Sequence, residues 1–347
     1  MKASTIGLVL IFTLNMSYSV KADKLKFAVV PKSKASFFDQ IGIGCQEAAA
    51  EIGADCLFYP GTKNSDIRVQ NRIIRHYIDK GVDGIAIAFL QSDRLAIENL
   101  QKAQVAGIPI VTIDSDLDIY TLKKYKKLRA AFIGTNNFEF GKMLGEQAKR
   151  LRPKGGKLCI QTGHQNSPNL NLRVMGVRSA LSGENYALPP GKKLKNINGW
   201  TEATRCPLHH NDQGDRSLKQ MEVMLGKAPT EIDTFVSVNF WPQAVPSDYR
   251  RMIQPFKNKI EQMEIVLIFG DTLEGQLELL KDHLSHVNIG QVPYEMGRQA
   301  IFTLHKIVKG EDYQEMNYTP LTYCTPENYN TCTKSSNVIW RPETEQH

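Results

Sequence analysis

The chain has 347 residues, of which 41% are hydrophobic and 23% are charged, and its formal net charge is +7. This composition is ordinary for a globular protein, and the basic residues are scattered along the chain, so nucleic-acid binding is not indicated. The length exceeds what one hydrophobic core usually organises and predicts two domains.

The first 22 residues have the pattern of a cleavable signal peptide. Lys2 precedes an apolar run over residues 6–14, and Val20, Lys21 and Ala22 form a small-x-Ala cleavage site. A membrane anchor is disfavoured because a span needs about 20 apolar residues. We therefore expect an exported protein whose fold begins at residue 23. The densest basic run, residues 123–127, is interpreted as a solvated face; contact with anionic lipid or a partner is the alternative.

Short apolar runs alternate with helical patterns from residue 25 onward, which predicts βα units and a parallel sheet. The first helix is indicated by apolar residues recurring from Phe38 to Ile52, and Gly53 ends it. Ser92 or Asp93 is expected to cap the third helix. The predicted strands of this series are 25–30, 56–59, 84–89, 109–113 and 131–134.

A second series of the same kind begins at about residue 136. Its predicted strands are 157–161, 234–238 and 265–269, and its predicted helices are 171–181, 217–225 and 273–280. Two open α/β sheets in tandem follow from this rhythm. No glycine fingerprint stands between the first strand and the first helix, where residues 31–36 lie instead, so a dinucleotide-binding enzyme is disfavoured.

Ligands meet open parallel sheets at the carboxyl ends of the strands. The loops at these ends are rich in hydrogen-bonding and aromatic side chains. They are residues 31–38, 89–92, 114–116, 163–173, 239–241, 270–272 and 290–294.

Six cysteines in an exported chain favour disulfides, although six cysteines allow 15 pairings. Cys324 and Cys332 enclose a short polar loop and are the preferred pair; Cys45 with Cys56 is a second plausible pair. Cys159 and Cys206 are each compatible with a free thiol, because buried thiols often behave as small apolar groups. No CxxC pair is present and His209-His210 is a weak signal, so no metal site is expected.

Several fragments, in order and at matching spacing, make the chain similar to the type I periplasmic sugar-binding proteins, the ribose- and galactose-binding group. The similarity covers nearly the whole mature length. The fragments are Ser36-Phe37-Phe38, residues 81–85, residues 106–114, residues 134–137 with Gly141, Asn169 with Arg173 and Gly176, and residues 290–297.

The resemblance implies an α/β fold of two doubly wound parallel-sheet lobes joined by a three-stranded hinge. The crossings would fall near Thr135, Gln291 and Leu321, giving lobes of 23–135 plus 292–321 and of 136–291 plus 322–347. It also implies a periplasmic protein that closes on a small polar ligand, a sugar or sugar derivative, and delivers it to the permease of an ABC importer. The alternative is a sensor that presents its closed form to a membrane histidine kinase or chemoreceptor.

By matching position, the resemblance implies a pocket made of Phe37, Phe38, Asp114, Arg173, Asn239 and Gln291. Aromatic faces pack on the C–H side of a sugar ring, while the polar side chains share its hydroxyls. Asp114 and Arg173 would be the strongest anchors because charged hydrogen bonds exceed neutral ones. Trp241 stands beside Asn239 at a strand end, where stacking on the ligand and a core role are equally open.

Each pocket residue has a structural alternative. Phe37 or Phe38 would open the first helix as a core residue, Asp114 would brace its loop, and Arg173 would lie on the surface beside an acid. Two departures from the family pattern leave the ligand open, including carboxylated or phosphorylated sugars. Ala35-Ser36 replaces an Asn-Pro pair in the loop that holds Lys32 and Lys34. The family's Phe-Asp-Gly-Thr is here Phe269-Gly270-Asp271-Thr272, so the pocket carboxylate is shifted by one residue to Asp271, which stays a candidate for ligand binding.

Catalysis is not expected, and no cofactor is implied. The sequence has no GxSxG elbow and no HExxH helix. Asp114 and Asp271 would in principle form a glycosidase pair, but binding proteins use the same carboxylates without chemistry. A repressor of the same fold would need an N-terminal helix-turn-helix, and the signal segment occupies that end.

Overall fold

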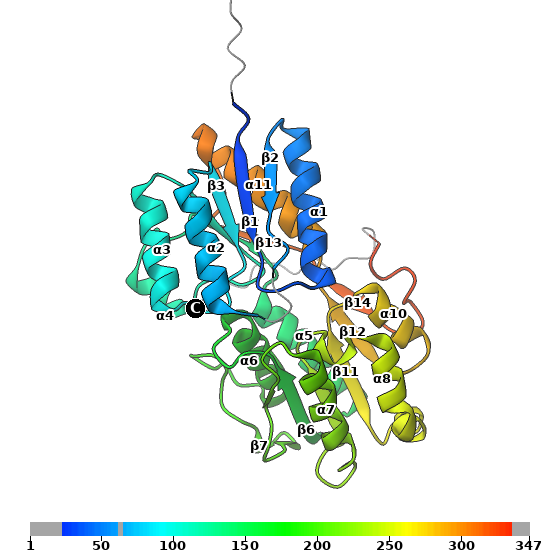
Figure 1. Cartoon of the computed structure of the whole chain (residues 1–347). Coiled ribbons are helices and arrows are strands. Elements are labelled where there is room, and N and C mark those ends of the chain that lie inside the picture. Colours follow the sequence, from blue (N-terminus) through cyan, green and yellow to red (C-terminus); the bar gives the residue numbers. More distant parts are fainter. Residues whose placement is uncertain (1–22, 62–64, 335–347) are drawn as a thin grey trace, which may run out of the picture.

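The computed structural model describes residues 23–61 and 65–334, which form two α/β lobes (Figure 1). The first sheet has the strand order β13-β5-β4-β3-β1-β2. Its strands are β1 (Lys26–Val30), β2 (Asp55–Phe58), β3 (Gly84–Ile87), β4 (Ile110–Ile113), β5 (Ala131–Gly134) and β13 (Met316–Tyr318).

The second sheet has the order β14-β12-β11-β10-β6-β8-β7, and β9 pairs with β6 beside this path. Its strands are β6 (Gly156–Thr162), β7 (Lys195–Ile197), β8 (Trp200–Glu202), β9 (Leu208–His209), β10 (Thr234–Ser237), β11 (Val266–Gly270), β12 (Val287–Gly290) and β14 (Thr322–Cys324).

Helices cover both faces of each sheet. They are α1 (Ser36–Glu51), α2 (Ile67–Asp79), α3 (Arg94–Val105), α4 (Ile119–Lys124), α5 (Asn137–Leu151), α6 (Pro168–Ser182), α7 (Gly214–Leu225), α8 (Pro246–Ile253), α9 (Lys257–Glu261), α10 (Glu274–Lys281) and α11 (Pro293–Lys309). Short 3-10 turns occur at Trp241–Gln243 and Gln254–Phe256.

The two faces of a strand supply two different cores. Phe27 and Val29 of β1 pack in the layer of α1 and α11, whereas Ala28 and Val30 pack in the layer of α2 and α3. Such burial on both faces explains the continuous apolar strands of this sequence. In Figure 1 the orange α11 lies beside the blue α1, so the chain returns to the first lobe late in its course.

The doubly wound parallel architecture is confirmed, with local differences. Asp93 caps α3 by accepting from the N–H of Ala96 at 2.7 Å, whereas Ser92 accepts from the N–H of Asp118. Two pairs are antiparallel, β12 with β14 and β7 with β8. The short strands β7, β8, β9, β13 and β14 were not predicted, because runs of two or three residues carry no apolar pattern of their own.

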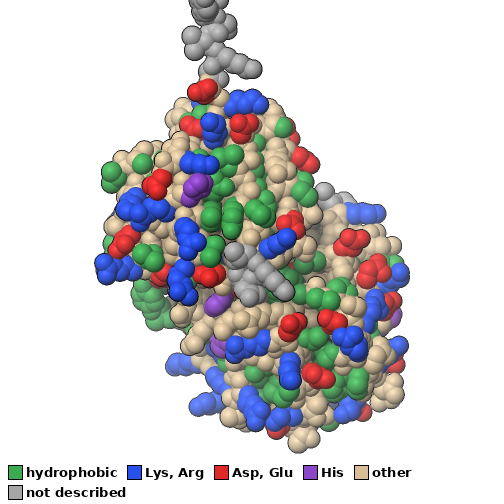
Figure 2. All heavy atoms as spheres, in the orientation of Figure 1, with side chains coloured by type: hydrophobic (Ala, Val, Ile, Leu, Met, Phe, Trp, Pro, Cys, Tyr) green, Lys and Arg blue, Asp and Glu red, His purple; other side chains and the backbone are tan. Residues whose placement is uncertain are grey.

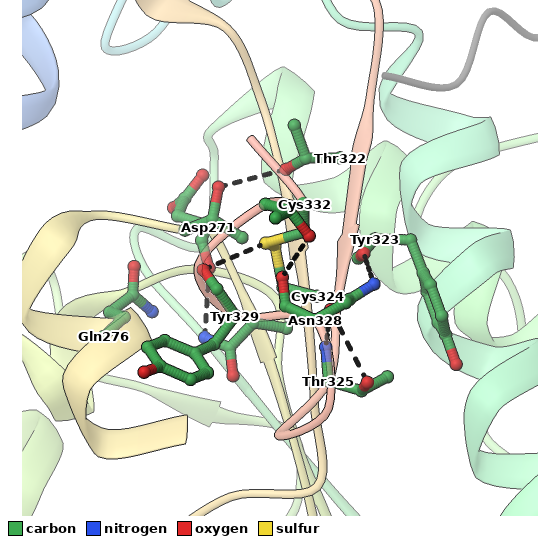
Figure 3. The surroundings of a disulfide bond; sticks show 12 residues. Asp271, Gln276, Thr322, Tyr323, Cys324, Thr325, Asn328, Tyr329 and Cys332 are labelled. Carbon is green, nitrogen blue, oxygen red and sulfur yellow. Dashed lines mark hydrogen bonds between the residues drawn. A yellow bond between two sulfur atoms is a disulfide. The ribbon is translucent and has the colours of Figure 1, made fainter. Parts of the chain in front are cut away.

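Three disulfides are formed. Cys45–Cys56 and Cys324–Cys332 confirm the two predicted pairs. The interpretation of Cys159 and Cys206 as free thiols is wrong, because these two buried cysteines pair with each other. In Figure 3 the Cys324–Cys332 bond closes the loop after β14, and the Asn328 side chain is hydrogen-bonded within it.

The predicted signal peptide, residues 1–22, lies outside the described residues. No helix within residues 23–61 and 65–334 has the length and apolarity needed to cross a membrane. Figure 2 shows basic and acidic side chains interspersed over the visible face of both lobes, in keeping with the scattered charge of the sequence.

Candidate functional site

A cavity of about 50 Å³ lies where the carboxyl ends of the two sheets face each other. All eight residues predicted for the pocket line it, namely Phe37, Phe38, Asp114, Arg173, Asn239, Trp241, Asp271 and Gln291. Six further residues complete the lining, namely Lys32, Ser33, Asn169, Leu170, Asp212 and Phe240. A water molecule needs at least about 10–15 Å³ of such space, so the cavity has room for more than one water. This space suits a compact molecule of at most one sugar ring.

Asp114 and Asp271 occupy equivalent positions in the two lobes. Asp114 follows β4 with φ 57°, and Asp271 follows β11 with φ 71°. Each backbone N–H donates to a carbonyl of the next strand, from Asp114 to Ile133 at 3.1 Å and from Asp271 to Ile289 at 2.6 Å. Aspartate visits the left-handed region more readily than most residues. The two carboxylates are therefore fixed at the facing edges of the two sheets.

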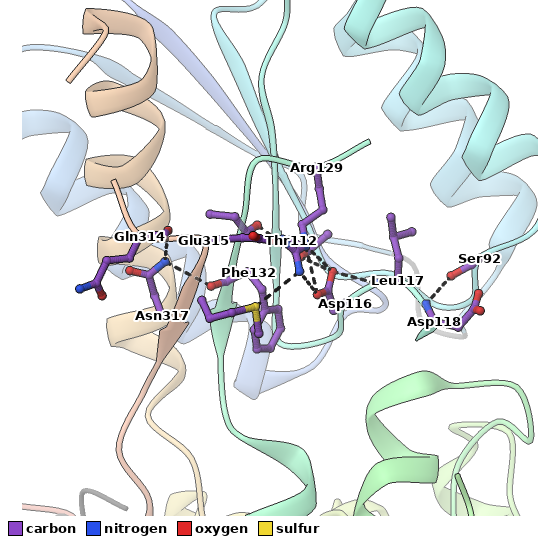
Figure 4. A network of polar contacts seen from close by, with 12 residues as sticks. Ser92, Thr112, Asp116, Leu117, Asp118, Arg129, Phe132, Gln314, Glu315 and Asn317 are labelled. Atoms are coloured by element: carbon purple, nitrogen blue, oxygen red, sulfur yellow. Dashed lines mark hydrogen bonds and ion pairs between the residues drawn. The ribbon is translucent and has the colours of Figure 1, made fainter. Parts of the chain in front are cut away.

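The turn that follows Asp114 is held by a network of polar contacts around Asp116 (Figure 4). The guanidinium of Arg129 forms an ion pair with Asp116 at 2.7 Å, and its Nη1 reaches Glu315 at 2.8 Å. Thr112 Oγ1 also donates to Asp116 at 2.7 Å. This network ties the turn after β4 to the segment preceding β13 and so supports the strained backbone of Asp114.

Lys32 places a cation inside the cavity. Its Nζ lies 3.0 Å from a carboxylate oxygen of Asp114, and both side chains are less than 10% exposed. The same Nζ donates to Asn169 Oδ1 of the opposite lobe at 3.1 Å. A second cross-lobe bond runs from Ser65 Oγ to Asp212 at 3.1 Å. The lobes are thus joined across the cleft by side-chain hydrogen bonds.

Arg173 is positioned by the close crossing of α5 and α6. A Cβ on Gly141 would overlap the carbonyl oxygen of Arg173, and a Cβ on Gly176 would overlap that of Phe138. The guanidinium lies 4.0 Å from the centre of the Phe140 ring. The interpretation of Arg173 as a surface residue is wrong, because its exposed fraction is 1%.

Two of the three guanidinium nitrogens of Arg173 form hydrogen bonds within the described residues. Its Nε donates to Asn137 Oδ1 at 2.8 Å and its Nη1 to the carbonyl of Val238 at 3.0 Å. Its Nη2 has no hydrogen-bond partner among the described residues. Burial lowers the pKa of Arg173, and the carboxylates of Asp271 and Asp114 oppose that effect.

Two amide side chains of the second lobe also keep one free end. Gln291 Nε2 donates to Asp271 Oδ1 at 2.7 Å, which leaves Gln291 Oε1 unpaired within the described chain. Asn239 Nδ2 is buried and likewise lacks a partner there. Burial raises the pKa of Asp271, whereas Arg173 and the Gln291 hydrogen bond lower it.

The aromatic residues have two roles at once. The Phe37 and Phe38 rings meet edge to face at 5.2 Å, and both belong to the core of the first lobe while lining the cavity. Trp241 stacks on Phe240 at 4.8 Å and packs against the same core. The core and pocket alternatives for these side chains are therefore not exclusive.

Some lining residues were accessible from sequence and some were not. Lys32 and Asn169 fall within the predicted strand-end segments 31–38 and 163–173, and Asn169 lies in the first turn of α6, but their side-chain contacts across the cleft have no sequence signal. Asp212 follows β9, a strand too short to be predicted. His209-His210 gives only a weak metal signal in the sequence, and within the described residues no group of three His, Cys, Asp or Glu side chains is arranged to hold a metal ion.

Comparison with known proteins gives a consistent result. The model of the periplasmic binding protein domain matches residues 27–312. The D-ribose/D-allose-binding protein of Pseudomonas aeruginosa is 32% identical over 172 residues, which are 48% of this chain and 53% of the relative. The chain thus spans about half the length of that curated relative.

Solved structures match over a larger part of the chain. A solute-binding protein of an ABC transporter from Burkholderia graminis, in complex with D-arabinose, is 26% identical with a TM-score of 0.74. The match covers 90% of this chain and 99% of that one. The XylFII-LytSN complex gives a TM-score of 0.69 at 20% identity, covering 88% and 99% of the two chains, which is a likeness of fold.

Proposed function

We propose that this chain, which belongs to the periplasmic binding protein family, captures one neutral monosaccharide between its lobes and delivers it to an ABC importer. Binding is the whole of its chemistry, and the sugar leaves the site unchanged. The eight predicted pocket residues and Lys32 are proposed to contact or orient the sugar.

The observation that carries this proposal is a set of three buried polar atoms, on residues that line one cavity, that have no hydrogen-bond partner among the described residues. Arg173 Nη2 and Asn239 Nδ2 are donors, and Gln291 Oε1 is an acceptor. A buried polar group without a partner costs about 1–3 kcal/mol. A sugar hydroxyl both donates and accepts, so a polyol satisfies all three atoms, and the aromatic rings beside them suit its C–H faces.

The charges of the cavity favour a neutral sugar. Lys32 is already paired with Asp114 at 3.0 Å, and the cation of Arg173 acts on the buried carboxyl of Asp271. An added carboxylate or phosphate would have to displace one of these carboxylates or lie close to both. Charged sugars, which the sequence left open, are therefore the disfavoured ligands.

Closure follows from the distribution of the site over two lobes. We propose lobes of residues 23–135 plus 292–321 and residues 136–291 plus 322–347. Support comes from sheet membership, since β1 to β5 and β13 share one sheet while β6 to β12 and β14 share the other. A ligand that contacts both lobes stabilises only the closed state and shifts the population toward it.

Export to the periplasm and docking on a permease complete the proposal. The names of the relatives support a sugar, since one is a D-ribose/D-allose-binding protein and another was solved with D-arabinose. Presentation of the closed form to a membrane sensor kinase or chemoreceptor is the second candidate. A neighbour in fold was solved as the XylFII-LytSN complex. Loss of sugar uptake on deletion of the gene supports import; loss of a sugar-induced transcriptional response with uptake intact supports sensing.

A thermal-shift panel on the mature protein tests the ligand class. The panel contains D-ribose, D-allose and D-arabinose, with D-gluconate and D-ribose 5-phosphate as charged counterparts. A ligand at 100 times its Kd stabilises the folded state by about 2.7 kcal/mol. We expect a neutral sugar to raise the Tm and calorimetry to give one site per chain. Stabilisation by the charged compounds alone contradicts the proposal, as does a catalysed change of the sugar.

A further inference from the structure

His210 is a fully buried histidine that does not line the cavity. It lies between β9 and α7 with an exposed fraction of 0%. Its ring contacts two residues that do line the cavity, Asn239 through the side chain and Asp212 through the backbone. The His210 ring is therefore placed to orient two residues that line the cavity.

The two ring contacts define the tautomer of His210. The backbone N–H of Asp212 donates to Nδ1 at 3.0 Å, so Nδ1 carries no proton. The proton of the neutral ring is then on Nε2, which lies 3.2 Å from Asn239 Oδ1 and donates to it. Burial lowers the pKa of His210 to about 4, against the opposing effects of Asp212 and of the Asn239 hydrogen bond. The ring is therefore neutral near pH 7.

The tautomer in turn fixes the orientation of the Asn239 amide. Asn239 Oδ1 also lies 3.3 Å from the hydroxyl of Ser237 and 3.4 Å from the backbone N–H of Trp241. Rotating the amide by half a turn would set Nδ2 against the N–H groups of His210 and Trp241. Asn239 Nδ2 is thereby held as the unpaired end of the amide.

We infer that His210 is a positioning residue that makes Asn239 a hydrogen-bond donor to the ligand, so that the bound sugar must present an acceptor oxygen at this point. The inference rests on the proposed capture of a sugar and adds a rule of specificity to it. An Asn239 amide that is free to rotate would accept a hydrogen bond from a sugar hydroxyl as well as donate one to it. When His210 fixes the amide, Asn239 Nδ2 only donates, so the sugar oxygen at this position has to accept.

The same ring supports a second part of the wall. Asp212 has φ 55°, its side chain accepts from Ser65 of the other lobe, and its backbone N–H is the group bound to His210 Nδ1. Replacing the ring thus affects the two lining residues that it contacts. A test of His210 therefore has to distinguish the loss of the Asn239 amide orientation from a general disturbance of the cavity.

The state of the ring is measurable without any ligand. Long-range ¹H–¹⁵N spectra of the wild-type protein at pH 7, with His210 assigned by comparison with His210→Gln, report which nitrogen carries the proton. We expect the neutral form with the proton on Nε2. A proton on Nδ1, or a charged ring, overturns the inference whether or not the protein binds a sugar.

The specificity rule is tested with His210→Gln and His210→Phe. The glutamine amide supplies an N–H in place of Nε2–H. Phenylalanine retains an aromatic ring but has neither of the two nitrogen atoms that make the hydrogen bonds of His210. Affinities are measured for the sugar that gives the largest shift among D-ribose, D-allose and D-arabinose, and for its deoxy and fluorodeoxy analogues. Fluorine accepts a hydrogen bond but donates none.

In the wild type we expect one hydroxyl position at which the fluorodeoxy analogue binds better than the deoxy analogue. In His210→Phe this preference disappears at that position alone, and affinity for the parent sugar falls by about three- to tenfold, the effect of one neutral hydrogen bond. His210→Gln retains the preference. A uniform loss of affinity for all analogues, or an unchanged ranking in His210→Phe, overturns the inference.

His286→Phe is the matched control. His286 Nδ1 accepts from the backbone N–H of Leu267 at 3.1 Å, and His286 is not among the cavity-lining residues. This variant loses a comparable ring contact, so its stability falls while the ranking of the analogues stays that of the wild type. If none of the three sugars binds the wild type, the proposed function fails for this panel, and the spectra still decide the role of the ring.

Discussion

Replacing Arg173 with lysine is expected to weaken sugar binding by about 10- to 150-fold. The substitution keeps a positive charge near Asp271 and Asp114 but removes the fork whose Nη2 is the unpaired donor. A hydrogen bond from a charged group contributes about 1.5–3 kcal/mol, which corresponds to this range of affinity. Titration calorimetry with the neutral sugar that gives the largest thermal shift measures the change directly.

Arg178→Lys is the control for this substitution, because Arg178 lies on the same helix and is equally buried. Its Nε and Nη2 bind Glu202 at 2.7 and 2.8 Å, and it does not line the cavity. Both variants lose internal hydrogen bonds, so both should unfold at lower urea concentration than the wild type. Only Arg173→Lys should change the Kd; an unchanged Kd for Arg173→Lys, or an equal loss in both variants, refutes the assignment.

Two further predictions concern stability. Burial lowers the pKa of His210 from 6.5 to about 4. Asp212 raises this pKa, and His164 and His209 lower it further. Only the unfolded chain takes up this proton as the pH falls from 6.5 toward 4, so the free energy of unfolding falls by up to about 3 kcal/mol. Urea unfolding at pH 7 and pH 4.5 measures this loss. An equal fall in the free energy of unfolding between these two pH values in the wild type and in His210→Gln contradicts the prediction. Replacing both Cys324 and Cys332, which are 8 residues apart, with serine should lower the free energy of unfolding by about 2–3 kcal/mol. Replacing both Cys159 and Cys206, which are 47 residues apart, should lower it by about 4 kcal/mol. The reverse order in urea unfolding contradicts this expectation.

The alternation of strands and helices was predictable because each βα unit is written locally. Strands such as β3, buried at all four positions, appear as continuous apolar runs, and glycines such as Gly53 end the helices with positive φ. The short strands β8, β9, β13 and β14 pair with strands far away in sequence, and β7 pairs only with its neighbour β8. Their two or three residues hold no periodicity of their own, and so they were missed.

The predicted pocket residues meet in one cavity because each follows the end of a strand or opens the helix after it. Parallel strands bring such ends to one edge, which groups Asn239 and Asp271 on the second sheet, whereas Asp114 lies on the facing edge of the first sheet, as the resemblance implied. The pairing of Lys32 with Asp114 and the bond from His210 to Asn239 depend instead on side-chain direction across tertiary contacts. No spacing in the chain encodes these contacts.

A crystal structure of the mature protein with the neutral sugar selected by the thermal-shift panel tests the central claim most directly. We expect the sugar in the cavity between the lobes, with its oxygens within hydrogen-bond distance of Arg173 Nη2, Asn239 Nδ2 and Gln291 Oε1. A sugar bound outside this cavity, or bound within it without engaging these three atoms, contradicts the claim.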